Sequence, residues 1–207
     1  NQTRGRGQIG TTWESADGMN ILLSVILYPT FLPPTQQYEL NKAVALAVYE
    51  TVTHFCGNEA SIKWPNDIFW KDKKVVGMLV ENAITPTKIE SSIIGIGLNV
   101  NQGAFSPSLK NATSISLAAG TQFELEEVLE YLCSAVEKRY LQLRNFKLEE
   151  INDDYLFHLY RLGKMTLFQI GKERFYGKIN GVDNAGKLLV ERDGIQSAYG
   201  IKEIAFL

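Results

Sequence analysis

The sequence predicts an α/β protein in two parts, a domain at residues 1–160 and a small C-terminal β-barrel at residues 161–207. In the first part, β-rich apolar runs alternate with segments whose apolar residues recur at helical spacing. Beyond Gly163 the pattern changes to short strands separated by turn residues. A chain of 207 residues, 45% of them hydrophobic, has enough apolar side chains to bury a sizeable core.

The first segment with a chemical signature is a glycine- and arginine-rich loop at residues 4–13, which ends in Trp13. Inward-facing backbone N–H groups and guanidinium groups can together bind an oxyanion such as a phosphate. The loop lacks the ending of a Walker loop, and its glycines precede the first strand, so neither common nucleotide fingerprint fits. A glycine-rich tail without a binding role is the competing interpretation. Trp13 favours a binding role, because an indole can stack on a planar base.

Two elements follow this loop. Residues 20–27 are almost continuously apolar, which predicts a central strand covered on both faces. Residues 38–55 carry apolar side chains at helical spacing, which predicts one amphipathic helix that ends by Gly57. We interpret His54, near the end of this helix, as a surface residue and not as a ligand.

The stretch Lys-Trp-Pro-Asn-Asp at residues 63–67 is the most informative part of the chain. A short strand at residues 60–62 should end at Pro65, and an extended run at residues 75–80 follows the basic residues 71–74. The pattern predicts a β-hairpin with cations beside its turn and a gap at Gly77, which could bind an anionic small molecule. Ordinary turn chemistry, solvated lysines and a strand bulge form the competing interpretation.

Residues 91–100 predict a further buried strand, in which Gly95 and Gly97 leave one face bare. Together with Gly77 they could form the floor of one pocket, with Asn99 and Asn101 at its polar end. The alternative is that these glycines only allow the strands to pack closely.

Two helices and a strand meander complete the chain. Thr121 and Glu124 have the spacing of a capping box before a long helix, and the apolar residues of 148–159 predict another helix. Strands are predicted at residues 165–170, 174–182, 188–191 and 197–207. We expect this β-barrel to cover the site of the first domain or a partner surface.

Composition argues against several classes of function. Lys and Arg number 21 against 23 Asp and Glu, with a net charge of -2 and no long basic run, so a nucleic-acid binder is not expected. Cys56 and Cys133 are far apart, and His54 and His158 are the only histidines, so we expect neither a zinc site nor a disulfide. No apolar run is long enough to cross a bilayer and no signal peptide is recognised, so we expect a cytoplasmic protein.

Three motifs in this order closely resemble the biotin protein ligases: the glycine-arginine loop, residues 63–67 followed by Lys74 and Gly77, and the Gly-Ile-Gly-Leu-Asn segment at residues 95–99. The resemblance covers essentially the whole chain. It implies a class-II-synthetase-like mixed β-sheet flanked by helices, plus an SH3-like C-terminal barrel. It also implies a monofunctional type without a DNA-binding domain, and residues upstream of Asn1.

Members of this family activate biotin with MgATP to biotinyl-5′-AMP and pyrophosphate, and then transfer biotin to a lysine of a biotin carboxyl carrier protein. The resemblance therefore implies biotin, ATP and a carrier biotinyl domain as partners, with no DNA and no membrane, and it allows a homodimer. Mg²⁺ would be held mainly by the phosphates, so no metal-binding residues are assigned.

The resemblance also assigns roles to residues of this chain. Lys74 would lie between the biotin carboxylate and the α-phosphate, Arg6 would close over the ligand, and Asp67 would orient or deprotonate the incoming lysine. The biotin-binding residues would be Gln2, Gly5, Arg6, Leu22, Lys74, Gly77, Leu79 and Gly95. The ATP-binding residues would be Arg6, Trp13, Asn66, Asp67, Lys74 and Asn99.

The chain departs from the family pattern in its loop, where Gln8, Thr11 and Thr12 stand at positions that are arginine in many relatives. Fewer cations predict weaker contacts to pyrophosphate and weaker retention of the adenylate. Leu22 likewise replaces an aromatic residue of some relatives. Lipoate ligases and octanoyltransferases, which share the fold and a similar lysine, are one alternative. A non-catalytic biotin sensor is the other.

Overall fold

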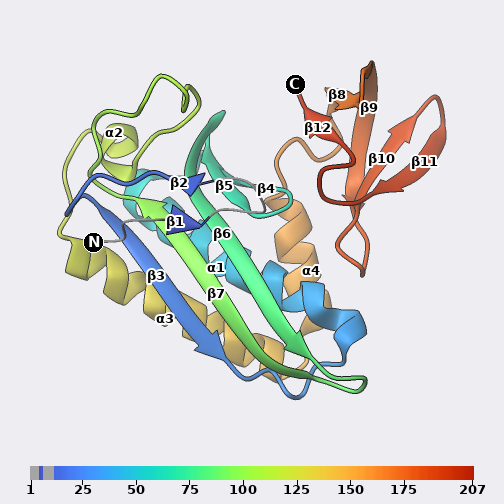
Figure 1. Cartoon of the computed structure of the whole chain (residues 1–207), viewed down its shortest axis with the longest axis horizontal. Helices are drawn as coiled ribbons and strands as arrows, with labels where there is room; N and C mark the ends of the chain where they lie inside the picture. Colours follow the sequence, from blue (N-terminus) through green and yellow to red (C-terminus); the bar gives the residue numbers. More distant parts are fainter. Residues whose placement is uncertain (1–4, 7–11) are drawn as a thin grey trace.

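The computed structural model describes residues 5–6 and 12–207. Its main sheet has five strands in the order β3-β7-β6-β5-β4, and every neighbouring pair is antiparallel (Figure 1). The strands are β3 (Asn20–Leu27), β4 (Ala60–Lys63), β5 (Asp67–Trp70), β6 (Lys73–Ile84) and β7 (Ile89–Asn99). The α/β class is confirmed. The sheet expected to be mixed is antiparallel throughout, because β4 to β7 follow one another through short turns.

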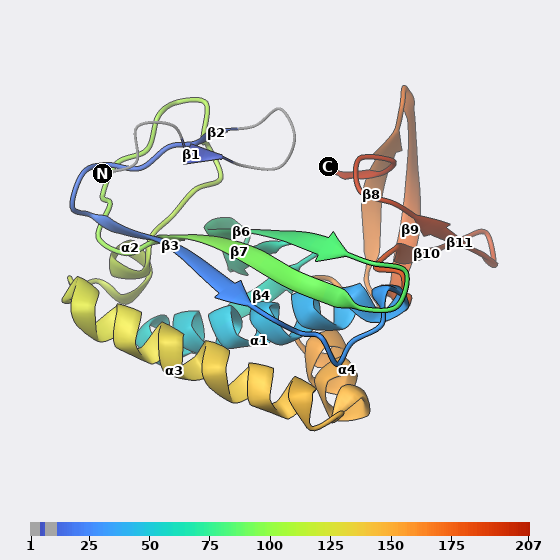
Figure 2. The same ribbon diagram turned by 60° about the horizontal axis from the view of Figure 1, so that its bottom comes forward.

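Helices cover one face of this sheet. Figure 2 shows helices α1 (Gln37–Cys56) and α3 (Leu125–Arg144) on one side of the strands, with the short pair β1 (Gly5–Arg6) and β2 (Thr12–Trp13) on the other. Alternate residues of β6 and β7 point toward the helices and are buried: Val76, Met78, Ile94, Ile96 and Leu98. The helix predicted at residues 38–55 is confirmed. The opposite face of the sheet, where no helix packs within the described residues, is available for a site.

Three sequence predictions about single elements are wrong in detail. The strand β3 lies at the edge of the sheet, paired only with β7, and Ile26 on its open face is 56% exposed. The segment predicted as one hairpin contains three strands, because residues 67–70 form β5 between β4 and β6. The expected capping box is absent: the Thr121 hydroxyl donates to the Gln122 carbonyl, and α3 begins only after Glu124.

The remaining helices are short. The sequence predicted α4 (Leu148–Phe157), but it did not reveal α2 (Ile115–Ala119) or the 3-10 turn η1 (Pro34–Gln36). Within the part of the chain that the structure describes, no helix is both long enough and apolar enough to cross a membrane.

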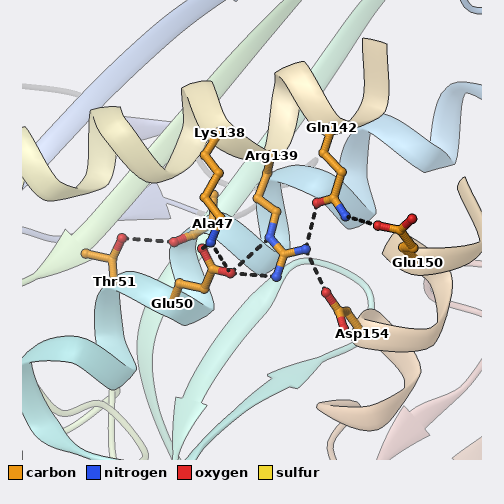
Figure 3. A network of polar contacts seen from close by, with 8 residues as sticks. All are labelled: Ala47, Glu50, Thr51, Lys138, Arg139, Gln142, Glu150 and Asp154. Atoms are coloured by element: carbon orange, nitrogen blue, oxygen red, sulfur yellow. Dashed lines mark hydrogen bonds and ion pairs between the residues drawn. The ribbon is translucent and has the colours of Figure 1, made fainter. Parts of the chain in front are cut away.

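A polar network joins helices α1, α3 and α4 beneath the sheet (Figure 3). Arg139 of α3 is 8% exposed and lies 2.5 Å from Glu50 of α1 and 2.7 Å from Asp154 of α4. Its Nη1 also donates to Gln142. Because one guanidinium contacts both neighbouring helices, it fixes their positions relative to α3.

The C-terminal strands form a second, separate sheet with the order β11-β10-β9-β8-β12 (Figure 1). They are β8 (Met165–Ile170), β9 (Glu173–Val182), β10 (Leu188–Arg192), β11 (Ile195–Tyr199) and β12 (Ala205–Phe206). The last predicted strand is thus divided in two by a turn at residues 200–204. The pairings among the described residues leave β11 and β12 as edges, so closure into a barrel stays a prediction.

Candidate active site

A cavity of about 1160 Å³ lies on the open face of the main sheet. Its lining comes from β3, β6 and β7, the segment 13–18, the turn at residues 65–67, the loop at residues 105–112, and Lys202 of the C-terminal sheet. The cavity brings together the site residues predicted from the sequence whose side chains are described: Trp13, Leu22, Asn66, Asp67, Lys74, Gly77, Leu79, Gly95 and Asn99.

Three further predicted site residues are in the N-terminal segment. Gln2 and the side chain of Arg6 lie outside what the structure describes. Gly5 and Arg6 are described as the backbone of β1, where Gly5 pairs with Trp13 and Arg6 pairs with Thr12. The backbone of Arg6 is therefore adjacent to the residue pair that includes the cavity-lining Trp13.

The floor of the cavity is built on glycine. Gly97 pairs with Leu22 on one side and with Gly77 on the other, and Gly77 pairs in turn with Asp67. The indole of Trp13 lies directly on this row. A Cβ atom at Gly97 would be 2.5 Å from Trp13 Cε2, and one at Gly77 would be 2.8 Å from Trp13 Cζ3. Glycine is needed at both positions because no side chain fits beneath the ring.

The floor at Gly95 differs. A Cβ atom there would meet only Leu79, at 3.9 Å, so the space above Gly95 is open. Ser24, Gly95 and Leu79 form the next row across the sheet. The floor therefore has one half covered by Trp13 and one half open to a ligand.

Lys74 places a positive charge beside this floor. Its Nζ is 2.6 Å from Asp67 Oδ1 and 5.6 Å from the centre of the Trp13 ring. Its backbone is held on both sides, since its N–H donates to the Asn111 carbonyl at 2.6 Å and its carbonyl accepts from the Thr113 N–H at 2.9 Å. The Lys74 side chain is 35% exposed, so the ion pair adds little to stability; it does position the ammonium group.

The two asparagines predicted to bind ATP have different environments. Asn66 Nδ2 donates to the Met78 carbonyl and the Asn66 carbonyl accepts from the Met78 N–H, so Asn66 fastens its turn to β6. Asn99 is 3% exposed and donates to the Thr113 carbonyl at 3.0 Å. Among the described residues, Asn99 Oδ1 and Trp13 Nε1 are buried without a partner. Each is a polar atom that a bound ligand could satisfy.

The sequence did not reveal which residues hold the segment that carries Trp13. Asn20 Nδ2 donates to Gln102 Oε1 at 2.5 Å and to Ser15 Oγ at 3.0 Å, and Gln102 Oε1 also accepts from the Ala16 N–H at 3.1 Å. These bonds tie the segment to β3 and to the end of β7. Asn20 could have been noticed in the sequence as a polar residue at the start of an apolar strand. Nothing in the sequence indicates that Lys202 lies at the cavity.

The motif at residues 63–67 contacts both the cavity and the C-terminal sheet. Asn66 and Asp67 line the cavity, whereas Trp64 Nε1 donates to the Gly186 carbonyl of the C-terminal sheet at 2.9 Å. Lys63 Nζ lies 4.4 Å from the ring of Phe69 and 5.0 Å from that of Phe206. Burial lowers the pKa of Lys63 from its ordinary value. One short motif thus supports the site and anchors the second sheet.

Comparisons with known proteins relate this site to one family. The model of the biotin/lipoate A/B protein ligase family matches residues 1–99, which include Lys74, Asp67 and the glycine floor. The bifunctional ligase/repressor BirA of Bacillus subtilis is 37% identical over 204 residues, which are 96% of this chain and 62% of that protein. The chain is similar to the biotin/lipoate A/B protein ligase family, through the match of residues 1–99.

Other proteins of similar sequence or structure extend the match along the chain. The biotin--[acetyl-CoA-carboxylase] ligase of Paracoccus denitrificans is 28% identical over 99% of this chain and 87% of its own length. The solved biotin protein ligase from Aquifex aeolicus in complex with biotin and ATP has a TM-score of 0.83 and 25% identity, over 100% of this chain and 85% of that one. The chain spans 62% of the length of the two Bacillus relatives it matches.

Proposed function

We propose that this chain activates biotin with ATP to biotinyl-5′-AMP and transfers biotin to a lysine of a biotin carboxyl carrier protein. The observation that carries the proposal is the position of Lys74, whose ammonium lies beside a glycine floor inside the cavity. Similar proteins support it, since the Paracoccus protein is a biotin--[acetyl-CoA-carboxylase] ligase and the Aquifex structure contains biotin and ATP.

In the first step, an oxygen of the biotin carboxylate forms a bond to the α-phosphorus of ATP. The bond from this phosphorus to the bridging oxygen of the β-phosphate breaks, and pyrophosphate leaves. Two anions must approach each other, so a fixed cation at the reacting atoms lowers the barrier. We assign this role to Lys74 and to Arg6 of the N-terminal segment, and we assign Gly5 and Gln2 to biotin binding.

The two halves of the floor suit the two ends of the product. The open space above Gly95, in a cavity that Leu22 and Leu79 also line, suits the ring of biotin. Trp13 and Asn99 suit the nucleotide, because an indole stacks on a base and the unpartnered Asn99 Oδ1 can accept from an amino group. Asn66 lies at the edge of the same region.

We expect magnesium to enter the site bound to the nucleotide. Among the described residues, no three carboxylate, imidazole or thiol groups gather into a metal-binding cluster. We therefore expect Mg²⁺ to be held mainly by phosphate oxygens, where it would neutralise phosphate charge.

In the second step, the amine of the carrier lysine attacks the carbonyl carbon of the adenylate and AMP leaves. The amine must lose a proton. Asp67 borders the cavity next to Lys74 and is 21% exposed, so its carboxylate can orient the incoming amine or take up the proton.

Replacing Lys74 tests the proposal. Lys74→Ala should slow pyrophosphate release with biotin and ATP by ~10²–10³-fold, the loss typical of one electrostatic contact to a transition state. The fold should survive, because Lys74 is held through its backbone. Lys73→Ala removes the neighbouring exposed lysine and should leave the rate unchanged. Near-normal pyrophosphate release by Lys74→Ala would contradict the assignment, and release with lipoate but not with biotin would favour the other branch of the family.

A further inference from the structure

The turn between β11 and β12 reaches the cavity of the main sheet. Of the cavity-lining residues that the structure describes, Lys202 alone comes from the C-terminal sheet. It lies in the turn at residues 200–204, which is closed by two hydrogen bonds: the Gly200 N–H donates to Glu203 Oε2 at 2.6 Å, and the Glu203 N–H donates to the Gly200 carbonyl at 3.1 Å. The next residue, Ile204, is buried and anchors the turn.

The backbone of Lys202 adopts a conformation that glycine would adopt more easily. Its φ is +68°, in the left-handed region where a Cβ atom is unfavourable. Other non-glycine residues of the chain share this feature, so the strain alone does not indicate function. At Lys202 the strained backbone coincides with a cationic side chain at the cavity, which a glycine would not provide.

The charges around the cavity explain why a further cation is useful. The described lining carries the acidic side chains of Glu14, Asp17, Asp67 and Glu81 against the basic side chains of Lys74 and Lys202. A nucleoside triphosphate brings several negative charges into this surrounding, and most of them lie on the phosphates beyond the α-phosphate.

We propose that Lys202 binds the β- and γ-phosphates of ATP and stabilises the pyrophosphate that leaves when the adenylate forms. Glu203 is a positioning residue, because its carboxylate holds the turn through the Gly200 N–H. The inference rests on the proposed function and adds a residue of the C-terminal sheet to the site. Because pyrophosphate has left before transfer, Lys202 should not affect the second step.

The two half-reactions separate this role from a structural one. Lys202→Gly removes the amine and relieves the backbone, so its midpoint of thermal unfolding should equal or exceed that of the wild type. In adenylate formation, kcat/KM for ATP should fall about 10- to 100-fold. The KM for biotin, and transfer from synthetic biotinyl-5′-AMP to a carrier biotinyl domain, should stay unchanged. Lys202→Arg should keep most of the wild-type kcat/KM for ATP. Lys172→Ala, which removes an exposed lysine of the same sheet, is the control and should leave this value unchanged.

Each outcome is decisive. If the wild type is active and Lys202→Gly has the same kcat/KM for ATP, the proposed role of Lys202 is wrong. Equal losses in both half-reactions would also overturn it, because they would indicate a general effect on the site. A wild type that forms no adenylate would instead refute the proposed function itself.

Discussion

Gly95 and Gly97 lie two positions apart on the same face of β7, but the space above them differs. Trp13 covers Gly97, whereas nothing closer than 3.9 Å stands above Gly95. The same methyl group added at the two positions therefore meets different surroundings. The pair allows the proposed nucleotide half and the proposed biotin half of the cavity to be tested separately.

Gly97→Ala should displace Trp13, because the new Cβ would be 2.5 Å from the indole and the backbone of Gly97 is paired with a strand on each side. We expect the KM for ATP to rise about tenfold, a loss of roughly 1.4 kcal/mol of binding free energy, with a change in tryptophan fluorescence. Gly95→Ala should leave the fluorescence unchanged and raise the KM for biotin by a similar factor. Steady-state pyrophosphate release with each substrate varied in turn measures both, and equal effects of the two variants on both substrates would refute the division of the floor.

The sequence was most informative where the proposed function uses residues close together in the chain. Lys74, Gly77 and Asp67 fall within one segment, and the strand pairing of Asp67 with Gly77 and of Gly77 with Gly97 brings them to one place. Lys202 and Gln102 could not be found in this way. Lys202 reaches the cavity, and Gln102 bonds to Asn20 beside it, only through packing between segments that are distant in the sequence.

At the level of elements, whether a segment forms a helix or a strand was easier to predict than where a strand lies in the sheet. The apolar run of β3 has the composition of a central strand, but its location is decided by its pairing with β7, about 70 residues away. The four residues of β5 follow directly after a Pro-Asn turn, so their strand character was hidden by the turn signal. The helix predictions succeeded because α1 and α3 each contain 20 residues with a regular apolar period.

Arg139 is the residue through which α1, α3 and α4 are joined (Figure 3). Arg139→Met should reduce the free energy of unfolding by roughly 2 kcal/mol, less than the ~3–5 kcal/mol of a fully buried pair. The reduction is smaller because Asp154 is 47% exposed and Glu50 keeps its contact with Lys138 at 3.3 Å. Urea unfolding measures the change. Lys147→Ala breaks an exposed pair with Glu150 and should give no resolvable change; equal effects of the two variants would argue against a special role for Arg139.

At the scale of the whole molecule, the position of the C-terminal sheet decides whether Lys202 reaches the cavity. Trp64 donates to the Gly186 carbonyl, and the ring of Tyr38 packs so closely on Gly186 that a Cβ atom there would be 2.3 Å from it. The Tyr38 hydroxyl lies 3.1 Å from that of Tyr155, and burial raises the pKa of Tyr38 well above its ordinary value, so the phenol stays neutral. The contact between the sheets is thus tightly packed at Gly186.

Gly186→Ala should weaken this contact. Its φ of +83° makes alanine unfavourable, by about 1 kcal/mol, and the clash with Tyr38 should add about 1–3 kcal/mol in the free energy of unfolding. Gly171→Ala is the matched control, because Gly171 lies in another turn of the same sheet with a φ of +56° and with nothing within 4 Å of its would-be Cβ. If the contact positions Lys202, Gly186→Ala should also lower kcat/KM for ATP, and Gly171→Ala should not. Denaturant unfolding and ATP-dependent pyrophosphate release measure the two effects, and equal destabilisation by both variants would show that the contact at Gly186 does not hold the second sheet in place.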